Sequence, residues 1–207
     1  FEKFMHIKAR FNGLEPDAAV LVATVRAVKS HGGIPTKELD VPNEDAVRLG
    51  MENLTHLIGV VKAFGLPVVV AINHFPTDTE GEKAIVKRSC EEAGAFAAVE
   101  SRVFEEGGAG AIELAEALIK ATEGPSPNIK YLYPIEASIQ DKVLALAQTV
   151  YNANDVSWNQ SALRALRGYE ANGWGALPVC MAKTNFSISH QASLKGRPSG
   201  YTFEVAD

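Results

Sequence analysis

Two apolar, β-branched segments separated by a helical pattern constrain the fold of this chain more than any other feature. Residues 18–24 (AAVLVAT) and 67–72 (PVVVAI) are near-continuous apolar runs, as expected of strands buried on both faces. Between them, apolar residues of 44–64 recur at intervals of three and four, which predicts an amphipathic helix. A strand, a helix and a strand in this order predict a βαβ unit and parallel pairing.

Capping and turn residues bound the elements of this unit. Asn43 is expected to cap the helix over 44–64, and Gly65 to end it. Thr79 and Glu82 have the spacing of a capping box, in which each residue bonds the other's backbone N–H. We therefore expect a second helix to begin directly after Thr79.

The rest of the chain continues the alternation of strands and helices. The pattern predicts a third strand at 96–101, a glycine-led helix at 107–121, a helix with Asp141 in its first turn, a helix at 159–172, strand character again at 173–182, and a last strand from 201. The expected fold class is α/β, with a mostly parallel sheet flanked by helices. Because aromatic residues concentrate after about residue 150, we expect two domains, 1–150 and 151–207.

Composition excludes several classes of function. The net charge of −5 over 207 residues argues against a general nucleic-acid binder, which usually has a basic face. No apolar run approaches the roughly 20 residues that span a bilayer, so no membrane partner is expected. The two cysteines and five histidines show no metal-ligand spacing, and we expect no metal site built from them.

The first polar strand end is VATVRAVKSHGG, residues 22–33. It brings Thr24, Arg26, Lys29 and His31 beyond a buried strand and finishes in two glycines, which let backbone approach a ligand closely. Ligands of open parallel sheets bind beyond the carboxyl ends of strands, and cations there suit a phosphate or carboxylate. A strand exit with solvated basic residues explains the pattern equally well.

The second polar strand end is VVVAINHFPTDT, residues 68–79. Asn73 offers a donor and an acceptor, and Asp78 follows it at short spacing. An amide followed by a carboxylate resembles the Asn-x-x-Asp device with which phosphate-loop nucleotidases recognise a purine edge, although the spacing here is one residue longer. The alternative is that Asp78 only caps the following helix beside Thr79.

Aromatic residues gather late in the chain, at Trp158, Trp174 and Phe186. Such rings suit a flat heteroaromatic ligand, although core packing is the usual explanation for such a cluster. No GxxxxGK[ST] phosphate loop occurs in these 207 residues. The glycine-rich stretch at 106–113 lacks the Lys and Ser/Thr of that loop, so we interpret it as a tight turn into a helix.

Together, these stretches resemble the formate–tetrahydrofolate ligase family. The matching segments run through essentially the whole chain in the family's order: FEKFMHIKAR, VATVRAVKSHGG, GLPVVVAINHFPTDTE, EGGAGAIELA, YPIEASIQDKV, LPVCMAKTNFSISH and LKGRPSGYTF. The resemblance implies a multidomain enzyme with a phosphate-loop nucleotidase-like fold. Residues 1–150 would be the remainder of the nucleotide-binding domain, and 151–207 the start of the folate-side domain.

The activity implied by the resemblance is the ATP-dependent ligation of formate to tetrahydrofolate in one-carbon metabolism. Its products are 10-formyltetrahydrofolate, ADP and phosphate, and formyl phosphate is the intermediate. The implied site residues are Asn73, Phe75, Thr77 and Asp78 for adenine, Arg26 and His31 with the turn at 32–33 for formyl phosphate, and Trp158 and Phe186 for the two faces of the pterin. Trp174 is expected to pack structurally.

The resemblance also implies ATP with Mg²⁺, an activating monovalent cation, a homotetramer, and formate and tetrahydrofolate as substrates. A cytoplasmic location is the default expectation, since no targeting signal is visible in this segment. The chain is under half the family's usual length, and the family's phosphate loop lies upstream of the matching segments. We therefore expect the 207-residue piece alone to be inactive. Two alternatives stay open: a non-catalytic nucleotide- or folate-binding module or scaffold derived from the ligase, and another phosphate-loop ligase that acts on a small carboxylate.

Overall fold

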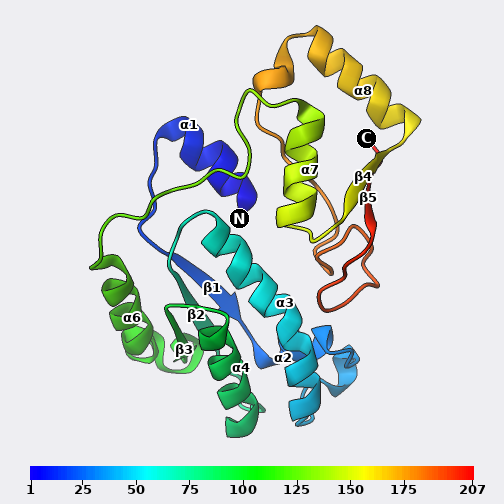
Figure 1. Cartoon of the computed structure of the whole chain (residues 1–207). Helices are drawn as coiled ribbons and strands as arrows, with labels where there is room; N and C mark the ends of the chain where they lie inside the picture. Colours follow the sequence, from blue (N-terminus) through cyan, green and yellow to red (C-terminus); the bar gives the residue numbers. More distant parts are fainter. The chain divides into compact units, whose positions relative to one another are not determined.

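The computed structural model describes residues 1–207 and divides them into two compact units (Figure 1). The central unit is Pro16–Ile129, and the terminal unit combines Phe1–Glu15 with Lys130–Asp207. This division differs from the boundary expected after residue 150. Its physical reason lies in the terminal unit, where the N-terminal helix packs on residues just after 130: the His6 ring stacks on Tyr133 at 4.0 Å, and Arg10 donates to the Tyr133 carbonyl oxygen at 3.1 Å.

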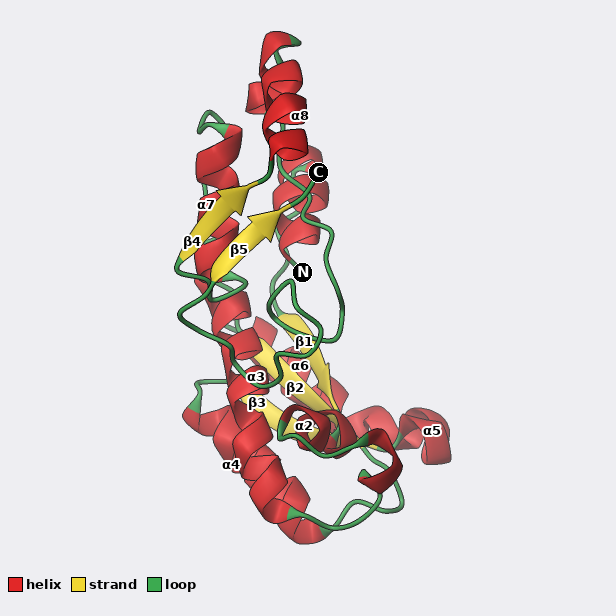
Figure 2. Cartoon of the chain, turned by 90° about the vertical axis from the view of Figure 1, so that its right-hand side faces the viewer, coloured by secondary structure: helices red, strands yellow, loops and turns green.

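The central unit contains a three-stranded parallel sheet. Its strands are β1 (Ala19–Ala23), β2 (Val68–Asn73) and β3 (Ala97–Ser101), in the order β1-β2-β3. Their arrows point the same way in Figure 2, and the register pairs Leu21 with Val70 and Val70 with Ala98. The α/β class and the parallel pairing predicted from the βαβ pattern are confirmed.

Helices cover this sheet on both sides. On one side lie α2 (Val25–His31), α3 (Glu44–Ala63) and α4 (Glu80–Glu92), which pack against one another; on the other side α6 (Ile112–Thr122) packs on β2 and β3 (Figure 1). Shorter turns complete the unit at Thr36–Glu38, Val103–Glu106 (α5) and Gly107–Ala111. The expectation that residues 18–24 are buried on both faces is wrong for β1. This strand lies at the sheet edge, where Val22 is 59% exposed.

The helix boundaries follow the predicted capping residues. The Asn43 side chain accepts a hydrogen bond from the N–H of Ala46 at the start of α3, and Gly65 ends that helix with φ +85°. Thr79 and Glu82 form both halves of the capping box at the start of α4. Both helix starts are thereby fixed by side chains that the sequence pattern had identified.

Two glycines allow α2 and α3 to approach closely. A Cβ atom on Gly32 would lie 2.0 Å from the carbonyl oxygen of Ala46, and one on Gly50 would lie 1.8 Å from that of Val28. Both distances are far below van der Waals contact with backbone, which cannot move aside cheaply. Gly32 therefore serves helix packing, whereas a close approach of its backbone to a ligand was expected from the sequence.

The terminal unit is built around α7 (Ile139–Thr149), α8 (Gln160–Ala171) and two parallel strands, β4 (Asp155–Trp158) and β5 (Thr202–Val205). A π-helical segment at Phe4–Ala9 continues as α1 (Arg10–Asn12). The helix with Asp141 in its first turn and the helix at 159–172 are confirmed, as is a strand near the end of the chain. The strand expected at 173–182 is wrong: a short 3-10 turn at Trp174–Ala176 is followed by irregular chain.

Two lysines, the buried Lys142 and the half-buried Lys183, hold much of that irregular segment. The ammonium of Lys142, on α7, donates to the carbonyl oxygens of Gly175 at 2.6 Å and Leu177 at 3.0 Å. Lys183 donates to the carbonyl oxygens of Thr184 and Ser187. Burial lowers the pKa of both lysines, and the carbonyl partners satisfy donors that would otherwise lack hydrogen-bond partners away from water.

No helix of the chain is both long and apolar enough to cross a membrane.

Candidate functional site

The carboxyl ends of β1 and β2 carry the polar side chains that the sequence analysis singled out in the central unit. β1 ends at Ala23, and α2 begins two residues later; β2 ends at Asn73, and α4 begins at Glu80. Residues 74–79, here called the Asp78 loop, connect β2 to α4. Since adjacent parallel strands end at the same edge of the sheet, the start of α2 and the Asp78 loop lie where open α/β sheets bind ligands.

The Asp78 loop is folded on itself around the Asp78 carboxylate. Oδ2 accepts from the Phe75 N–H at 3.0 Å, while the Asp78 N–H donates to the Phe75 carbonyl oxygen at 2.9 Å. The other oxygen, Oδ1, is buried and has no hydrogen-bond partner. Burial raises the pKa of Asp78, against the lowering effect of the Phe75 hydrogen bond. The helix cap is Thr79, so the alternative that Asp78 only caps α4 is wrong.

Arg26 and the Asp78 loop meet through a residue that the sequence analysis missed. Arg26, in the first turn of α2, pairs with the carboxylate of Asp40, and the Thr77 hydroxyl donates to the same oxygen at 3.2 Å. The Arg26 guanidinium also lies 5.4 Å from the centre of the Phe75 ring, within cation–π range. Asp40 lies 37 residues before Thr77 in an irregular loop, and no local motif marks it.

The other basic residues of VATVRAVKSHGG do not join Arg26. Lys29 is completely buried, and its ammonium bonds Glu82 at 3.0 Å and the Val41 carbonyl oxygen at 3.2 Å, so it does not face a ligand as expected. His31 lies in the last turn of α2, five residues beyond Arg26, a rise of about 7.5 Å along the helix axis. The stretch is a capped helix, with Thr24 accepting from the Ala27 N–H.

A second polar cluster, also missed from the sequence, lies beside the Asp78 loop. Glu100, on β3, pairs with His74 Nδ1 at 3.0 Å, with Lys83 at 2.9 Å and with Arg102 at 2.7 Å. Burial alone would raise the pKa of Glu100, but Lys83, Arg102 and His74 lower it on balance. The carboxylate is therefore held charged at the end of β3. A sequence signal for it would have been the charged pair Glu100–Arg102 at a strand end.

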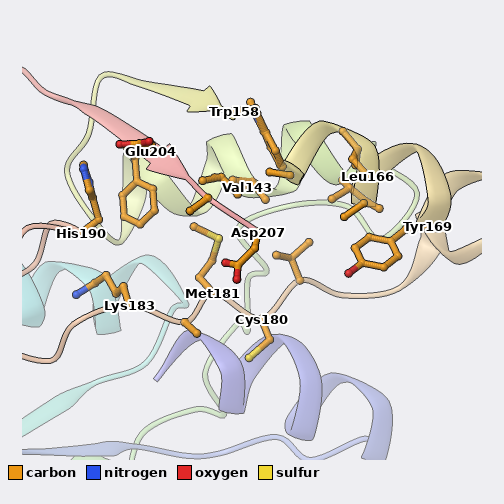
Figure 3. A pocket seen from close by; sticks show the side chains of 18 of the residues that line it. Val143, Trp158, Leu166, Tyr169, Cys180, Met181, Lys183, His190, Glu204 and Asp207 are labelled. Atoms are coloured by element: carbon orange, nitrogen blue, oxygen red, sulfur yellow. The ribbon is translucent and has the colours of Figure 1, made fainter. Parts of the chain in front are cut away.

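The terminal unit contains a pocket of about 650 Å³, shown in Figure 3. Trp158, from the end of β4, lines it together with Leu166, Tyr169, Cys180 and Met181, and acidic groups enter from Glu204 and Asp207. The lining is mainly apolar and aromatic with a few polar groups, as is common for small-molecule sites.

Only one of the two aromatic residues predicted for the pterin site lies at the pocket. Trp158 lines the pocket, whereas Phe186 does not; its ring is 62% exposed and lies 5.7 Å from the ammonium of Lys195. Trp174, expected to pack structurally, stacks on Tyr169 at 5.8 Å between ring centres and also lines the pocket. Tyr169 was not identified from the sequence.

The Asp78 loop offers one hydrogen-bond acceptor and one partly exposed aromatic face to a ligand. The buried, unpartnered Oδ1 of Asp78 can accept from an amino group on a purine ring, and the Phe75 ring, 37% exposed, offers a face for stacking. Asn73, at the end of β2, is exposed and has an amide free to orient. No group of three or more His, Cys, Asp or Glu residues in the chain is arranged to hold a metal ion.

Comparisons with known proteins give a consistent result. The family model described as formate–tetrahydrofolate ligase matches residues 1–207. The chain is 49% identical to a formate–tetrahydrofolate ligase of Roseiflexus sp. (strain RS-1), and 45% identical to both the mitochondrial and the cytoplasmic C-1-tetrahydrofolate synthase of Saccharomyces cerevisiae. Each match covers all of this chain, which spans 38% of the bacterial relative and 22% of each yeast relative. The chain belongs to the formate–tetrahydrofolate ligase family.

Proposed function

We propose that this protein takes part in the ATP-dependent ligation of formate to tetrahydrofolate, which yields 10-formyltetrahydrofolate, ADP and phosphate. Membership of the ligase family supports this reaction. In the proposed sequence, a formate oxygen attacks the γ-phosphorus of ATP and ADP leaves. The N10 amine of the folate then attacks the carbon of formyl phosphate, and phosphate leaves as the amine loses its proton.

The unpartnered Oδ1 of Asp78 is the observation that carries the proposal. It is a buried acceptor at the carboxyl end of β2, in a carboxylate whose other oxygen is already bonded to the Phe75 N–H. A buried acceptor without a partner has lost its hydrogen bonds to water and has gained none from the protein. An adenine amino group would donate the missing hydrogen bond to Oδ1. We assign Asn73, Phe75, Thr77 and Asp78 to the adenine, with the Phe75 ring against one face of the base.

Arg26 is proposed to act on the transferred groups. Its guanidinium is partly exposed at the start of α2 and can bind two oxygens of a phosphate or carboxylate at once. Its present partner, Asp40, is more exposed and can turn to water when an oxyanion arrives. His31 remains a prediction from family resemblance; its place at the far end of α2 supports a contact with a different part of the substrates.

We propose that Trp158, in the pocket of the terminal unit, contacts one face of the folate pterin ring and that Phe186 contacts the other face. Support comes from the size and aromatic lining of the pocket around Trp158. For Phe186 to contact the same pterin ring as Trp158, the irregular segment around 184–195 must change its conformation when folate binds. This segment is held largely by side-chain bonds to backbone, such as that of Lys195 to the Phe186 carbonyl oxygen, which a rearrangement can break.

We further propose Mg²⁺ as the counter-charge of the nucleotide phosphates, since Mg²⁺ commonly binds substrate phosphates with only one or two carboxylates. A monovalent cation and a homotetrameric assembly are proposed from family resemblance, and a cytoplasmic location is proposed with support from the cytoplasmic yeast relative. The names of the yeast relatives include both a cytoplasmic and a mitochondrial protein.

The reaction is tested with the protein at its full natural length. Product formation that requires ATP, formate and tetrahydrofolate together is expected, with ADP and 10-formyltetrahydrofolate formed in equal amounts. The 207-residue chain by itself is predicted to form no product, because it contains no GxxxxGK[ST] loop. Binding of ATP or folate without any turnover at full length would support the alternative, a non-catalytic binding module.

A further inference from the structure

The carboxylate of Glu82 joins three elements of the central unit. Oε1 accepts from the Lys29 ammonium at 3.0 Å and from the Asn43 N–H at 2.8 Å. Oε2 accepts from the N–H and the hydroxyl of Thr79, each at 3.0 Å. Glu82 thus exceeds the requirements of a capping box, which would need only its bonds to Thr79.

The partners of Glu82 anchor both loops of the candidate nucleotide site. Thr79 directly follows Asp78, and Asn43 is the last residue of the irregular loop that contains Asp40 and precedes α3. Lys29 strengthens the second connection, since its ammonium also donates to the Val41 carbonyl oxygen at 3.2 Å. In Figure 1 the start of α4 lies at the same end of the unit as α2 and the start of α3. One buried carboxylate therefore fixes the positions from which Asp40 and Asp78 extend.

Neither side chain of the pair can contact a ligand, because Lys29 and Glu82 are both 0% exposed. Stability alone is a weak reason for such a pair, since apolar residues of similar volume often pack as well or better in its place. Burial alone would raise the pKa of Glu82, but the hydrogen bonds from Asn43, Thr79 and Lys29 lower it on balance, so the carboxylate is charged and fully bonded.

We propose that Glu82, supported by Lys29, is a positioning residue that holds the Asp78 and Asp40 loops in the geometry that binds the nucleotide. The inference rests on the proposed function for the identity of the ligand. The anchoring itself is a property of the unliganded protein. It acts through backbone N–H groups, so its loss displaces the loops without removing any ligand-contacting side chain.

The test replaces the pair together, Lys29→Met with Glu82→Met, in the protein at full natural length. The apolar pair fills similar volume and leaves no buried charge behind. Without ligand, amide hydrogen exchange at Asn43 and Thr79 is expected to accelerate at least tenfold. The Kd for ATP is expected to rise about tenfold, while the KM for tetrahydrofolate stays unchanged. The matched control is Val86→Ala, in the buried core face of α4. It is expected to lower stability and to leave the exchange at Asn43 and Thr79 and the Kd for ATP as in the wild type.

Each outcome decides a separate part of the inference. Unchanged exchange at Asn43 and Thr79 would overturn the anchoring. Accelerated exchange with an unchanged Kd for ATP would overturn its role in nucleotide binding. A wild-type protein that does not bind ATP would refute the proposed function, and exchange alone would then decide whether the anchor exists. If the double variant does not fold, Glu82→Gln serves instead, because its amide group cannot accept from all four donors, and the same changes are expected.

Discussion

Replacing Asp78 by Asn changes the candidate adenine contact at a single atom. The Asn oxygen can still accept from the Phe75 N–H as Oδ2 does, so the loop keeps its internal bond. The unpartnered Oδ1 becomes an NH₂ group, which donates rather than accepts. The variant therefore removes the proposed acceptor for the adenine amino group with little change in shape.

The expected effect is a loss of ATP affinity of about 1.5 kcal/mol, roughly tenfold in Kd. Hydrogen bonds to charged groups contribute about 1.5–3 kcal/mol, and the lower end applies because Asp78 is only partly buried. Calorimetric titration of wild type and Asp78→Asn, each with ATP and with purine riboside triphosphate, completes a double-mutant cycle. The second nucleotide lacks the 6-amino group, so the two losses should not add.

Additivity is the result that would refute this reasoning. A coupling energy below about 0.5 kcal/mol between Asp78→Asn and removal of the amino group would mean that the two do not interact. Asp45→Asn is the matched control, because Asp45 is a highly exposed carboxylate on α3 paired only with Arg48. Its cycle is expected to show no coupling.

Three further predictions follow from the same structure. Burial raises the pKa of folded Asp78 above its unfolded value near 3.9, so the charged carboxylate costs stability as pH rises from about 4 through the folded pKa. Asp78→Asn should therefore be more stable than wild type at pH 7, and urea unfolding should show this difference in stability shrinking toward pH 4. A difference that stays constant with pH would contradict the burial argument. Gly50→Ala places a Cβ against the Val28 carbonyl oxygen and should lower the free energy of unfolding by about 1–3 kcal/mol or more; an unchanged urea midpoint would show that α2 and α3 do not pack as closely as described. Replacing Trp158 or Phe186 by Ala should weaken folate binding by about 1–3 kcal/mol and affect ATP less, and equal losses for both ligands would indicate a core role instead.

The elements that could be predicted are those fixed by local chemistry. Asn43, Gly65, Thr79 and Glu82 act within a few residues of their own position, and the structure uses all four as the spacing indicated. The exposed edge of β1 could not be foreseen in this way. Continuous apolar character shows that a strand suits a buried environment, but it does not show which neighbours this strand has.

The candidate site was predicted only in part, for a similar reason. Asn73 ends β2, and Phe75, Thr77 and Asp78 lie in the loop directly after it, so one short motif could identify all four together. Asp40 and Glu100 reach the site from distant segments, and no spacing connects them to it. Lys29 was misinterpreted because the sequence shows a lysine near a strand end and does not show the buried Glu82 that accepts from it.

The assignment of the Asp78 loop to adenine is tested most directly by the structure of the full-length protein with a non-hydrolysable ATP analogue. The measured quantity is the distance from the adenine 6-amino nitrogen to Asp78 Oδ1. We expect a hydrogen bond of about 2.7–3.2 Å, with the Phe75 ring against the base. A base bound elsewhere, with Oδ1 of Asp78 still unpartnered or bonded only to water, would contradict the assignment.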